Sequence, residues 1–297
     1  MSTEHNPRAG VMFTSMRFLP SVALRYHRDV HNSLAKAFLL HLILFAAVAQ
    51  SSIAAQPSLS AAGERAQLGT EPSRERFCVA LDIGHLPSAP GAMAADGKME
   101  YESNRHMVEL IAANLQRDDR IRVVVVNAAG KRISLSGRAT AAKAAGADLL
   151  LSIHHDSVND RYLEAERQPN GRVLYHCDRF SGYSVFYSKK NRDALHSLEF
   201  AEALGLALRR QGLTPTLHHA EPIKGENREL VNRDLAVYRF DDLIVLKSAA
   251  IPAALLECGV IVNRSEEAEL LSDERQEKVV AAVHQAVIAI ADIARRD

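Results

Sequence analysis

Short hydrophobic runs alternate with longer amphipathic stretches from residue 77 to the C-terminus. Each run has the length of a buried β-strand, and the runs lie at residues 77–83, 123–126, 149–153, 185–187 and 253–256. The stretches have the periodicity of helices, and they lie at residues 104–115, 135–145, 193–211 and 273–294. In the last stretch, one stripe carries Val279, Val283, Val287, Ile290 and Ile293. Strands that alternate with helices predict an α/β domain, in which helices cover both faces of a mostly parallel sheet.

The N-terminal region has a different pattern. Four basic residues between positions 17 and 36 precede a hydrophobic run over residues 37–47. The run is shorter than the roughly 20 residues that span a bilayer, and two small-residue cleavage patterns follow it, at 47–49 and 52–54. This order predicts a secretory signal peptide over residues 1–54 and a periplasmic or secreted protein. An uncleaved membrane anchor is the alternative, and Met16 is an alternative start.

Residues 55–75 lack hydrophobic periodicity and contain Pro, Ser and Gly, which is typical of a linker. We therefore expect a single folded domain, over residues 76–297, to carry the chemistry. The chain has 36 basic and 36 acidic residues, so no net charge attracts it to nucleic acid, and we expect no such partner.

Three cysteines are too few for a disulfide scaffold. Cys78 and Cys258 lie inside hydrophobic runs, where a buried thiol is the simplest interpretation. An oxidising compartment permits one disulfide among Cys78, Cys177 and Cys258, but the sequence does not identify the pair.

Two histidines lie at the carboxyl ends of predicted strands. His85 follows the run at 77–83, and His154 follows the run at 149–153. Ligands collect beyond the carboxyl ends of parallel strands, and a catalytic zinc site needs three protein ligands and one open position. Glu100 and Glu102, in the loop before the first helix, are the candidates for the third ligand.

Glu257 comes directly after four hydrophobic residues of the last strand. A carboxylate buried there without a partner is costly, so it is a candidate general base beside a metal-activated water molecule. The alternative is a structural carboxylate that caps a helix or pairs with an arginine such as Arg264.

Five segments follow one another along the predicted domain: LDIGH, GKMEYESN, SLSGRATAAKAAGADLLLSIHHDS, GYSVFYS and IPAALLECGVIVN. In order and approximate spacing they resemble the motifs of the zinc-dependent N-acetylmuramoyl-L-alanine amidase family. The resemblance covers residues 77 to 295. The resemblance implies that His85, Glu100 and His154 hold one Zn²⁺ ion and that Glu257 is the general base. Glu100 is preferred over Glu102 because it lies four residues before Asn104, as in the family motif. The resemblance further implies a peptidoglycan substrate and a monomer, and it leaves open whether an activator protein is needed.

The sequence departs from the family pattern at several positions. Ile83 replaces a proline, Asp156 an asparagine and Val260 a phenylalanine, and the usual threonine-arginine pair is missing at Asn127-Ala128. Asp156 either orients another group beside the metal or is a solvated residue at the strand end, and we expect the latter.

Other polar residues near these motifs have structural explanations. His155 is expected on the opposite side of its strand from His154, in packing or hydrogen bonding. His176, His218 and His219 lie in segments predicted to be irregular and have no identified partner. Arg138 and Asn263 match family positions, where ion pairing and helix capping account for them.

An extra loop over residues 158–181 interrupts the resemblance directly after His154. We expect it to contact substrate, because long loops beside a site are often recognition elements. It lacks the clean amphipathic helix that an autoinhibitory insertion would need.

Two further hypotheses use the same residues. A zinc amidohydrolase of small N-acyl amino acids would need the same ligand set, but the export signal and the extra loop favour a polymeric substrate. A catalytically silent wall-binding module is disfavoured because all four site residues are retained.

Overall fold

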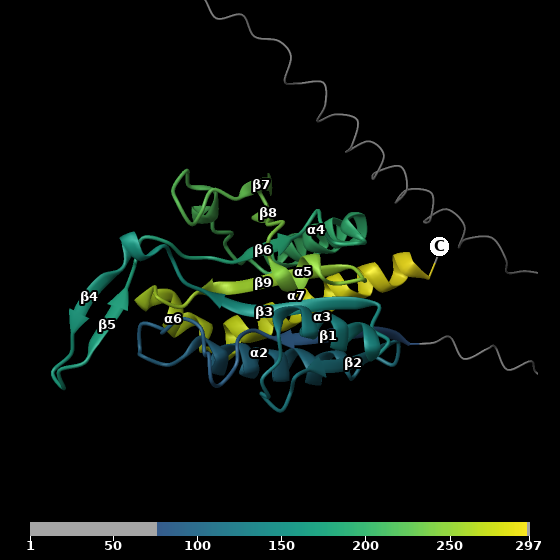
Figure 1. The fold of residues 1–297 in the computed structure, drawn as a ribbon, viewed down its shortest axis with the longest axis horizontal. Helices are drawn as coiled ribbons and strands as arrows, with labels where there is room; N and C mark the ends of the chain where they lie inside the picture. The colour runs from purple at the N-terminus through teal and green to yellow at the C-terminus, as the bar shows by residue number, and fades with distance from the viewer. Residues whose placement is uncertain (1–75, 296–297) are drawn as a thin grey trace, which may run out of the picture. The chain divides into compact units, whose positions relative to one another are not determined.

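The computed structural model describes residues 76–295, so the predicted signal peptide and linker lie outside the described residues. Seven strands form one sheet in the order β2-β1-β3-β9-β6-β8-β7 (Figure 1). Their bounds are β1 (Phe77–Ile83), β2 (Ile121–Val126), β3 (Leu149–Asp156), β6 (Ser184–Tyr187), β7 (Glu229–Asn232), β8 (Val237–Arg239) and β9 (Ala253–Val260). The strands β2, β1, β3 and β9 are parallel, and β6 runs antiparallel to β9.

Helices cover both faces of this sheet. Their bounds are α2 (Glu100–Leu115), α3 (Leu135–Ala144), α4 (Ala194–Arg210), α5 (Ile244–Lys247), α6 (Arg264–Leu270) and α7 (Asp273–Ala294). The long helix α7 packs against α2 and α4, whereas α3 packs against α5 and β2. The predicted fold class, an α/β domain with a mostly parallel sheet, is confirmed.

Hydrophobic burial explains why these segments form these elements. Every residue of β1 is buried, as expected for a strand that has a helical layer on each side. In α7, Val279, Val283 and Val287 are fully buried, but Ile293 is 42% exposed, so the buried stripe ends one turn earlier than predicted. The helix begins at its predicted residue because the hydroxyl of Ser272 accepts a hydrogen bond from the Arg275 amide.

The extra loop contains secondary structure that was not predicted. It contains the 3-10 turn η1 (Asp160–Tyr162) and the antiparallel hairpin of β4 (Glu164–Arg167) and β5 (Val173–His176). Figure 1 shows the hairpin projecting beyond the end of the sheet at which β9 terminates. His176 therefore lies in a strand, and His218 and His219 form the 3-10 turn η2 (His218–Ala220), so the prediction that these segments are irregular is wrong.

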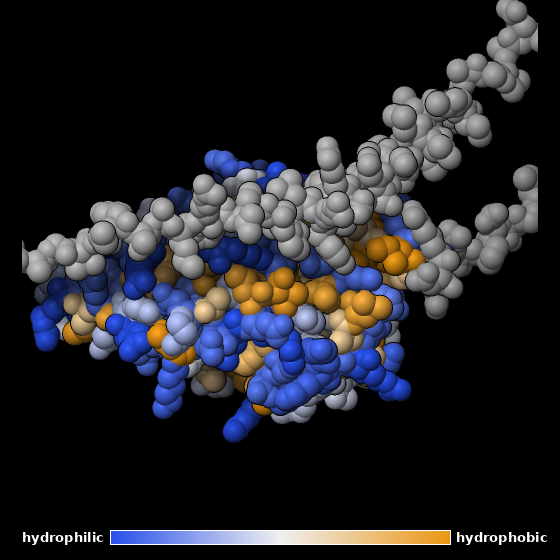
Figure 2. Space-filling model, turned by 90° about the horizontal axis from the view of Figure 1, so that it is seen from above, coloured by the Kyte–Doolittle hydropathy of each residue, from blue (hydrophilic) through white to orange (hydrophobic). Residues whose placement is uncertain are grey.

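The surface of the described residues is mixed. Figure 2 shows one face, on which hydrophobic residues form groups separated by hydrophilic ones. Among the helices over residues 76–295, none has both the length and the hydrophobicity to cross a membrane.

Candidate active site

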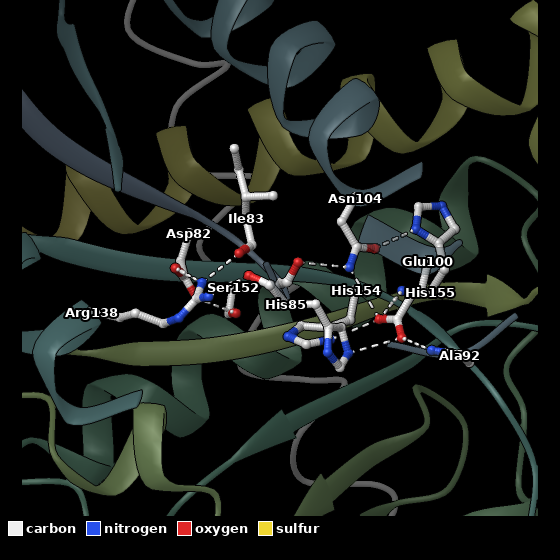
Figure 3. A network of polar contacts seen from close by, with 11 residues as sticks. Asp82, Ile83, His85, Ala92, Glu100, Asn104, Arg138, Ser152, His154 and His155 are labelled. Atoms are coloured by element: carbon white, nitrogen blue, oxygen red, sulfur yellow. Dashed lines mark hydrogen bonds and ion pairs between the residues drawn. The ribbon is translucent and has the colours of Figure 1, made fainter. Parts of the chain in front are cut away.

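Three of the predicted site residues converge at the carboxyl ends of β1 and β3. Glu100 Oε2 lies 2.9 Å from His85 Nε2, and Glu100 Oε1 lies 3.0 Å from His154 Nδ1 (Figure 3). One candidate ligand atom from each residue lies within 4.8 Å of the others. Ligand atoms around a tetrahedral zinc ion are about 3.3 Å apart, given bonds of about 2.0–2.1 Å. This set, called the first triad below, therefore fits a zinc ion after small outward movements of its side chains.

A tight backbone turn brings His85 to this position. A Cβ atom on Gly84 would lie 2.6 Å from the His154 ring and 2.7 Å from Asn104 Nδ2, so only glycine fits between the strand and the histidine. His85 itself has a φ of 66°, in the left-handed region. Arg138 on α3 stabilises the turn, because its guanidinium donates to the carbonyl groups of Ile83 and His85 and pairs with Asp82 at 2.7 Å.

Glu100 is the first residue of α2 and is only 4% exposed. Its carboxylate accepts hydrogen bonds from the Ala92 amide, at 3.1 Å, and from Asn104 Nδ2, at 3.1 Å. Burial opposes ionisation, but hydrogen bonds with His154 and His85 outweigh it and hold the pKa of Glu100 well below its usual value. The residue is thus an anion that faces both histidines, whereas Glu102 is exposed on the helix and outside the triad.

Glu257 lies beside His154, its register partner on the neighbouring parallel strand. The Oε2 atom of Glu257 is buried and makes no hydrogen bond to any residue between 76 and 295. Burial, followed by the negative charges of Asp156 and Glu100, raises the pKa of Glu257 well above its usual range. A divalent cation at the first triad would oppose this shift, because it neutralises Glu100.

The structural alternatives for Glu257 do not hold. Arg264 pairs with Asp178 at the base of the hairpin. Asn263 caps α6 through hydrogen bonds from the amides of Ser265 and Glu266, as its sequence position suggests. Within residues 76–295, the Oε2 atom of Glu257 is therefore engaged neither by an arginine nor by a helix cap.

A second group of ligand-type side chains lies at the end of β3, and sequence reasoning missed it. Asp156 is only 8% exposed, so the expectation of a solvated strand-end residue is wrong. Its Oδ2 atom lies 3.1 Å from His218 Nε2 and 2.8 Å from His219 Nε2. These three residues, called the second triad below, are all buried and have ligand atoms within 4.8 Å of one another. The adjacent histidine pair was the available signal, but Asp156 is too distant in sequence to be recognised as its partner.

His155 and the cysteines have structural roles. His155 is buried on the other side of β3 from His154, where its Nδ1 atom lies 2.8 Å from Asn104 Oδ1. Cys78, Cys177 and Cys258 are all buried and free in the described part of the chain.

The family described as N-acetylmuramoyl-L-alanine amidase matches residues 79–289 of this chain. The chain belongs to that family. It is 25% identical over 251 residues to the amidase AmiA of Salmonella typhimurium, and the match covers 80% of this chain and 84% of AmiA. The amidase is therefore a hydrolase of the amide bond between N-acetylmuramic acid and L-alanine in peptidoglycan, and the predicted reaction is confirmed.

Solved amidase structures share the fold. The N-acetylmuramoyl-L-alanine amidase from Clostridium difficile 630 is 23% identical, with a TM-score of 0.55, and the match covers 73% of this chain and 97% of that one. The CwlD amidase from Clostridioides difficile, solved in complex with the GerS lipoprotein, is 19% identical, with a TM-score of 0.54 over 73% of this chain and 100% of CwlD.

One departure of this amidase from the family motifs, Val260, lies near the base of the extra loop. Val260, where the motif has a phenylalanine, packs with Val158, Cys177 and Val262 in a small hydrophobic cluster that joins the loop to the end of β9. The Cys177 amide also donates to the carbonyl of Val262, at 2.8 Å. The smaller side chain at position 260 thus lies where the extra loop packs against the end of β9.

Proposed function

We propose that His85, Glu100 and His154 bind one Zn²⁺ ion per chain and that Glu257 is the general base of the amidase reaction. The observation that carries the proposal is the position of Glu257 beside His154 on the adjoining strand, where its Oε2 atom has no hydrogen-bond partner among the described residues. Two imidazoles and one carboxylate are a common ligand set of catalytic zinc.

A zinc ion bound by these residues supplies a Lewis acid and lowers the pKa of water towards roughly 7. Glu257 accepts a proton from the attacking water molecule while the oxygen of that water bonds to the lactyl carbonyl carbon of N-acetylmuramic acid. The same carboxyl group then gives that proton to the nitrogen of L-alanine, and the carbon–nitrogen bond breaks. The products are a glycan with a free lactyl carboxylate and a stem peptide with a free amine.

The remaining contacts hold these groups in position. Asn104 Nδ2 donates to Glu100 Oε1, at 3.1 Å, and to the carbonyl of Gly84, at 3.3 Å, so α2 is tied to the turn that carries His85. Outer-shell contacts of this kind orient metal ligands and raise affinity.

Glu257→Gln tests the base assignment, because it removes the proton acceptor and keeps the size of the side chain. We expect peptide release from purified sacculi to fall by about 10²–10⁴-fold, while the zinc content is unchanged. Glu102→Gln is the matched control, since Glu102 is exposed and outside the triad. A Glu257→Gln variant with the wild-type rate would contradict the assignment.

The same assay separates this proposal from an enzyme of small N-acyl amino acids. The hairpin at the end of the sheet that carries the site favours an extended substrate. Activity on small acyl amino acids that exceeds activity on sacculi would support the alternative. A protein that holds no zinc and releases no peptide would instead support a silent wall-binding module.

Export and assembly belong to the same proposal. The signal-like pattern in residues 1–54 and a wall substrate together support a periplasmic or secreted enzyme. We propose that the chain is a monomer. Because CwlD is solved with a lipoprotein partner, a protein activator of this chain is a hypothesis, which the activity of the purified chain alone would test.

A further inference from the structure

We propose that the second triad, Asp156, His218 and His219, is a second divalent metal site suited to Zn²⁺, beside the candidate base Glu257. This inference goes beyond the proposed function, because that function requires only the ion at the first triad. It concerns different residues, which no motif of the family pattern predicted as ligands.

The two triads have the same donor set, two imidazole nitrogens and one carboxylate oxygen. Contacts within the second triad, at 2.8 and 3.1 Å, are as close as the 2.9 and 3.0 Å contacts within the first. The presence of aspartate at position 156, where the family motif has asparagine, supplies the anionic ligand. Imidazole and carboxylate ligands in this number suit zinc among the common divalent ions.

The orientation of the side chains supports a shared ligand. Asp156 Oδ2, His218 Nε2 and His219 Nε2 are all shielded from solvent, yet none makes a hydrogen bond with proper geometry to a described residue. The three atoms are at contact distance but do not form hydrogen bonds with one another. This arrangement is expected where their lone pairs are directed at a common ion. Three buried polar atoms without partners are otherwise costly.

The outer contacts of both histidines are those of metal ligands. His218 Nδ1 lies 2.8 Å from the hydroxyl of Thr216, and His219 Nδ1 lies 3.0 Å from Glu226 Oε2. A ligating histidine usually donates its other N–H to a carboxylate or a similar acceptor, which leaves the lone pair of the opposite nitrogen for the metal. Phe180 and Phe186 pack against the two rings, with centroids 5.1 and 4.9 Å away, and restrict their rotation.

The second triad borders a cleft that also reaches the proposed general base. Asp156 and His219 line a cleft together with Glu226, Arg228 and Glu257. An ion held by Asp156 would therefore neutralise one of the two negative charges that face Glu257.

A proton is the competing occupant. Burial alone would lower the pKa of His219, but the carboxylates of Asp156 and Glu226 outweigh burial and raise it to about 9. A protonated His219 would form an ordinary buried ion pair. His219 Nε2 lies 2.8 Å from Asp156 Oδ2, a distance that fits such a pair, so the metal content of the protein decides between a proton and an ion.

Metal counting on the purified holoenzyme distinguishes the two occupants. We expect two zinc ions per chain by elemental analysis, and anomalous scattering at the zinc edge in crystals should place one ion at each triad. Asp156→Asn keeps the shape of the side chain and should reduce the count to one, as should Glu100→Gln at the other site. Glu221→Gln, at the end of η2, is the matched control and should retain both ions.

The outcomes separate the proposals. A wild-type protein with one ion at the first triad, and an Asp156→Asn variant with the same count, would overturn the second site. An ion at the second triad alone would support this inference and contradict the proposed ligands of the active site. If Asp156→Asn does not fold, His219→Gln and the anomalous map of the wild-type protein decide the question.

Discussion

Arg138 donates a hydrogen bond to the main-chain carbonyl of His85, and so fixes the turn that presents this histidine. The same guanidinium neutralises Asp82, and both side chains of the pair are at most 3% exposed. Ser152 Oγ also donates to Asp82, at 2.8 Å, which ties the pair to β3. One buried cation thus links the sheet, helix α3 and a candidate metal ligand.

We expect Arg138→Met to lower the free energy of unfolding by about 3–5 kcal/mol, because it leaves the Asp82 carboxylate buried and unpaired. Urea unfolding followed by circular dichroism, with EDTA present, measures the loss. We also expect weaker zinc binding in a competition titration, since the His85 turn loses its anchor.

The double variant Arg138→Met/Asp82→Asn is the control for this experiment. It should recover part of the stability, because no isolated charge remains, but not the zinc affinity. A single variant that is within about 1 kcal/mol of the wild type would contradict the importance of the pair.

Loss of the Glu100 carboxylate should remove the ion at the first triad. We expect Glu100→Ala to bind zinc at this site at least 10-fold more weakly and to release almost no peptide from sacculi. The reason is that the variant lacks the carboxylate that contacts both histidines and is the proposed anionic ligand of the ion. Glu102→Ala, two residues away on the same helix turn, should retain wild-type zinc content and activity. Equal effects of the two substitutions would show that charge near the site, and not ligation, is what matters.

Histidine burial should make stability depend on pH. Burial lowers the pKa of His155 to about 4, against about 6.5 in an unfolded chain. Between these pH values the unfolded state therefore binds more protons than the folded state. The contribution of neutral His155 to the free energy of unfolding is complete above about pH 6.5. As the pH falls towards 4, the free energy of unfolding decreases by about 3 kcal/mol.

Comparison with His155→Asn isolates that contribution. Asparagine places an amide near the Nδ1 position, where it can still donate to Asn104, and it does not titrate. Urea unfolding between pH 4 and 7, with EDTA present in both samples, should give a flatter profile for the variant. Parallel profiles would show that His155 is not the group responsible.

The hairpin should contribute to substrate recognition and little to folding. All residues of β4 are exposed, and Glu164 and His176 are register partners. They can therefore be joined directly by an Asn-Gly turn in place of residues 165–175. We expect the shortened protein to keep its circular dichroism spectrum and to lose about 10-fold or more of its activity on sacculi.

A soluble disaccharide-peptide fragment of peptidoglycan provides the comparison. The shortened protein should cleave this fragment at a rate close to that of the wild type, because the reacting groups are untouched. Equal losses on both substrates would indicate that the hairpin supports the active site and does not recognise the polymer.

The sequence predicts the central elements because their signals are local. All residues of β1 except Asp82 are hydrophobic, and the observed bounds of β1 and α7 match the predicted ones. The strand-end positions of His85 and His154 follow from the same pattern and from the topology of parallel sheets. The position of Glu257 after a hydrophobic run makes it a candidate, and Glu100 is one of two candidate carboxylates, but their roles follow mainly from the resemblance.

The remaining features depend on contacts between distant residues. The strands β7 and β8 have only four and three residues, too short for a period to be visible. The second triad joins the end of β3 to a 3-10 turn, and no local pattern connects them. Its burial is a tertiary property, so Asp156 looks like any solvated residue at a strand end.

The register of β3 and β9 has a consequence for how such an enzyme can diversify. His154 and Glu257 are direct neighbours across two paired strands, so the spacing of about 4.8 Å between strands sets their separation. Backbone ladder bonds, and not a loop, therefore fix the distance between a metal ligand and the proton acceptor. The segments that follow β3 can therefore differ in length or sequence without changing this distance.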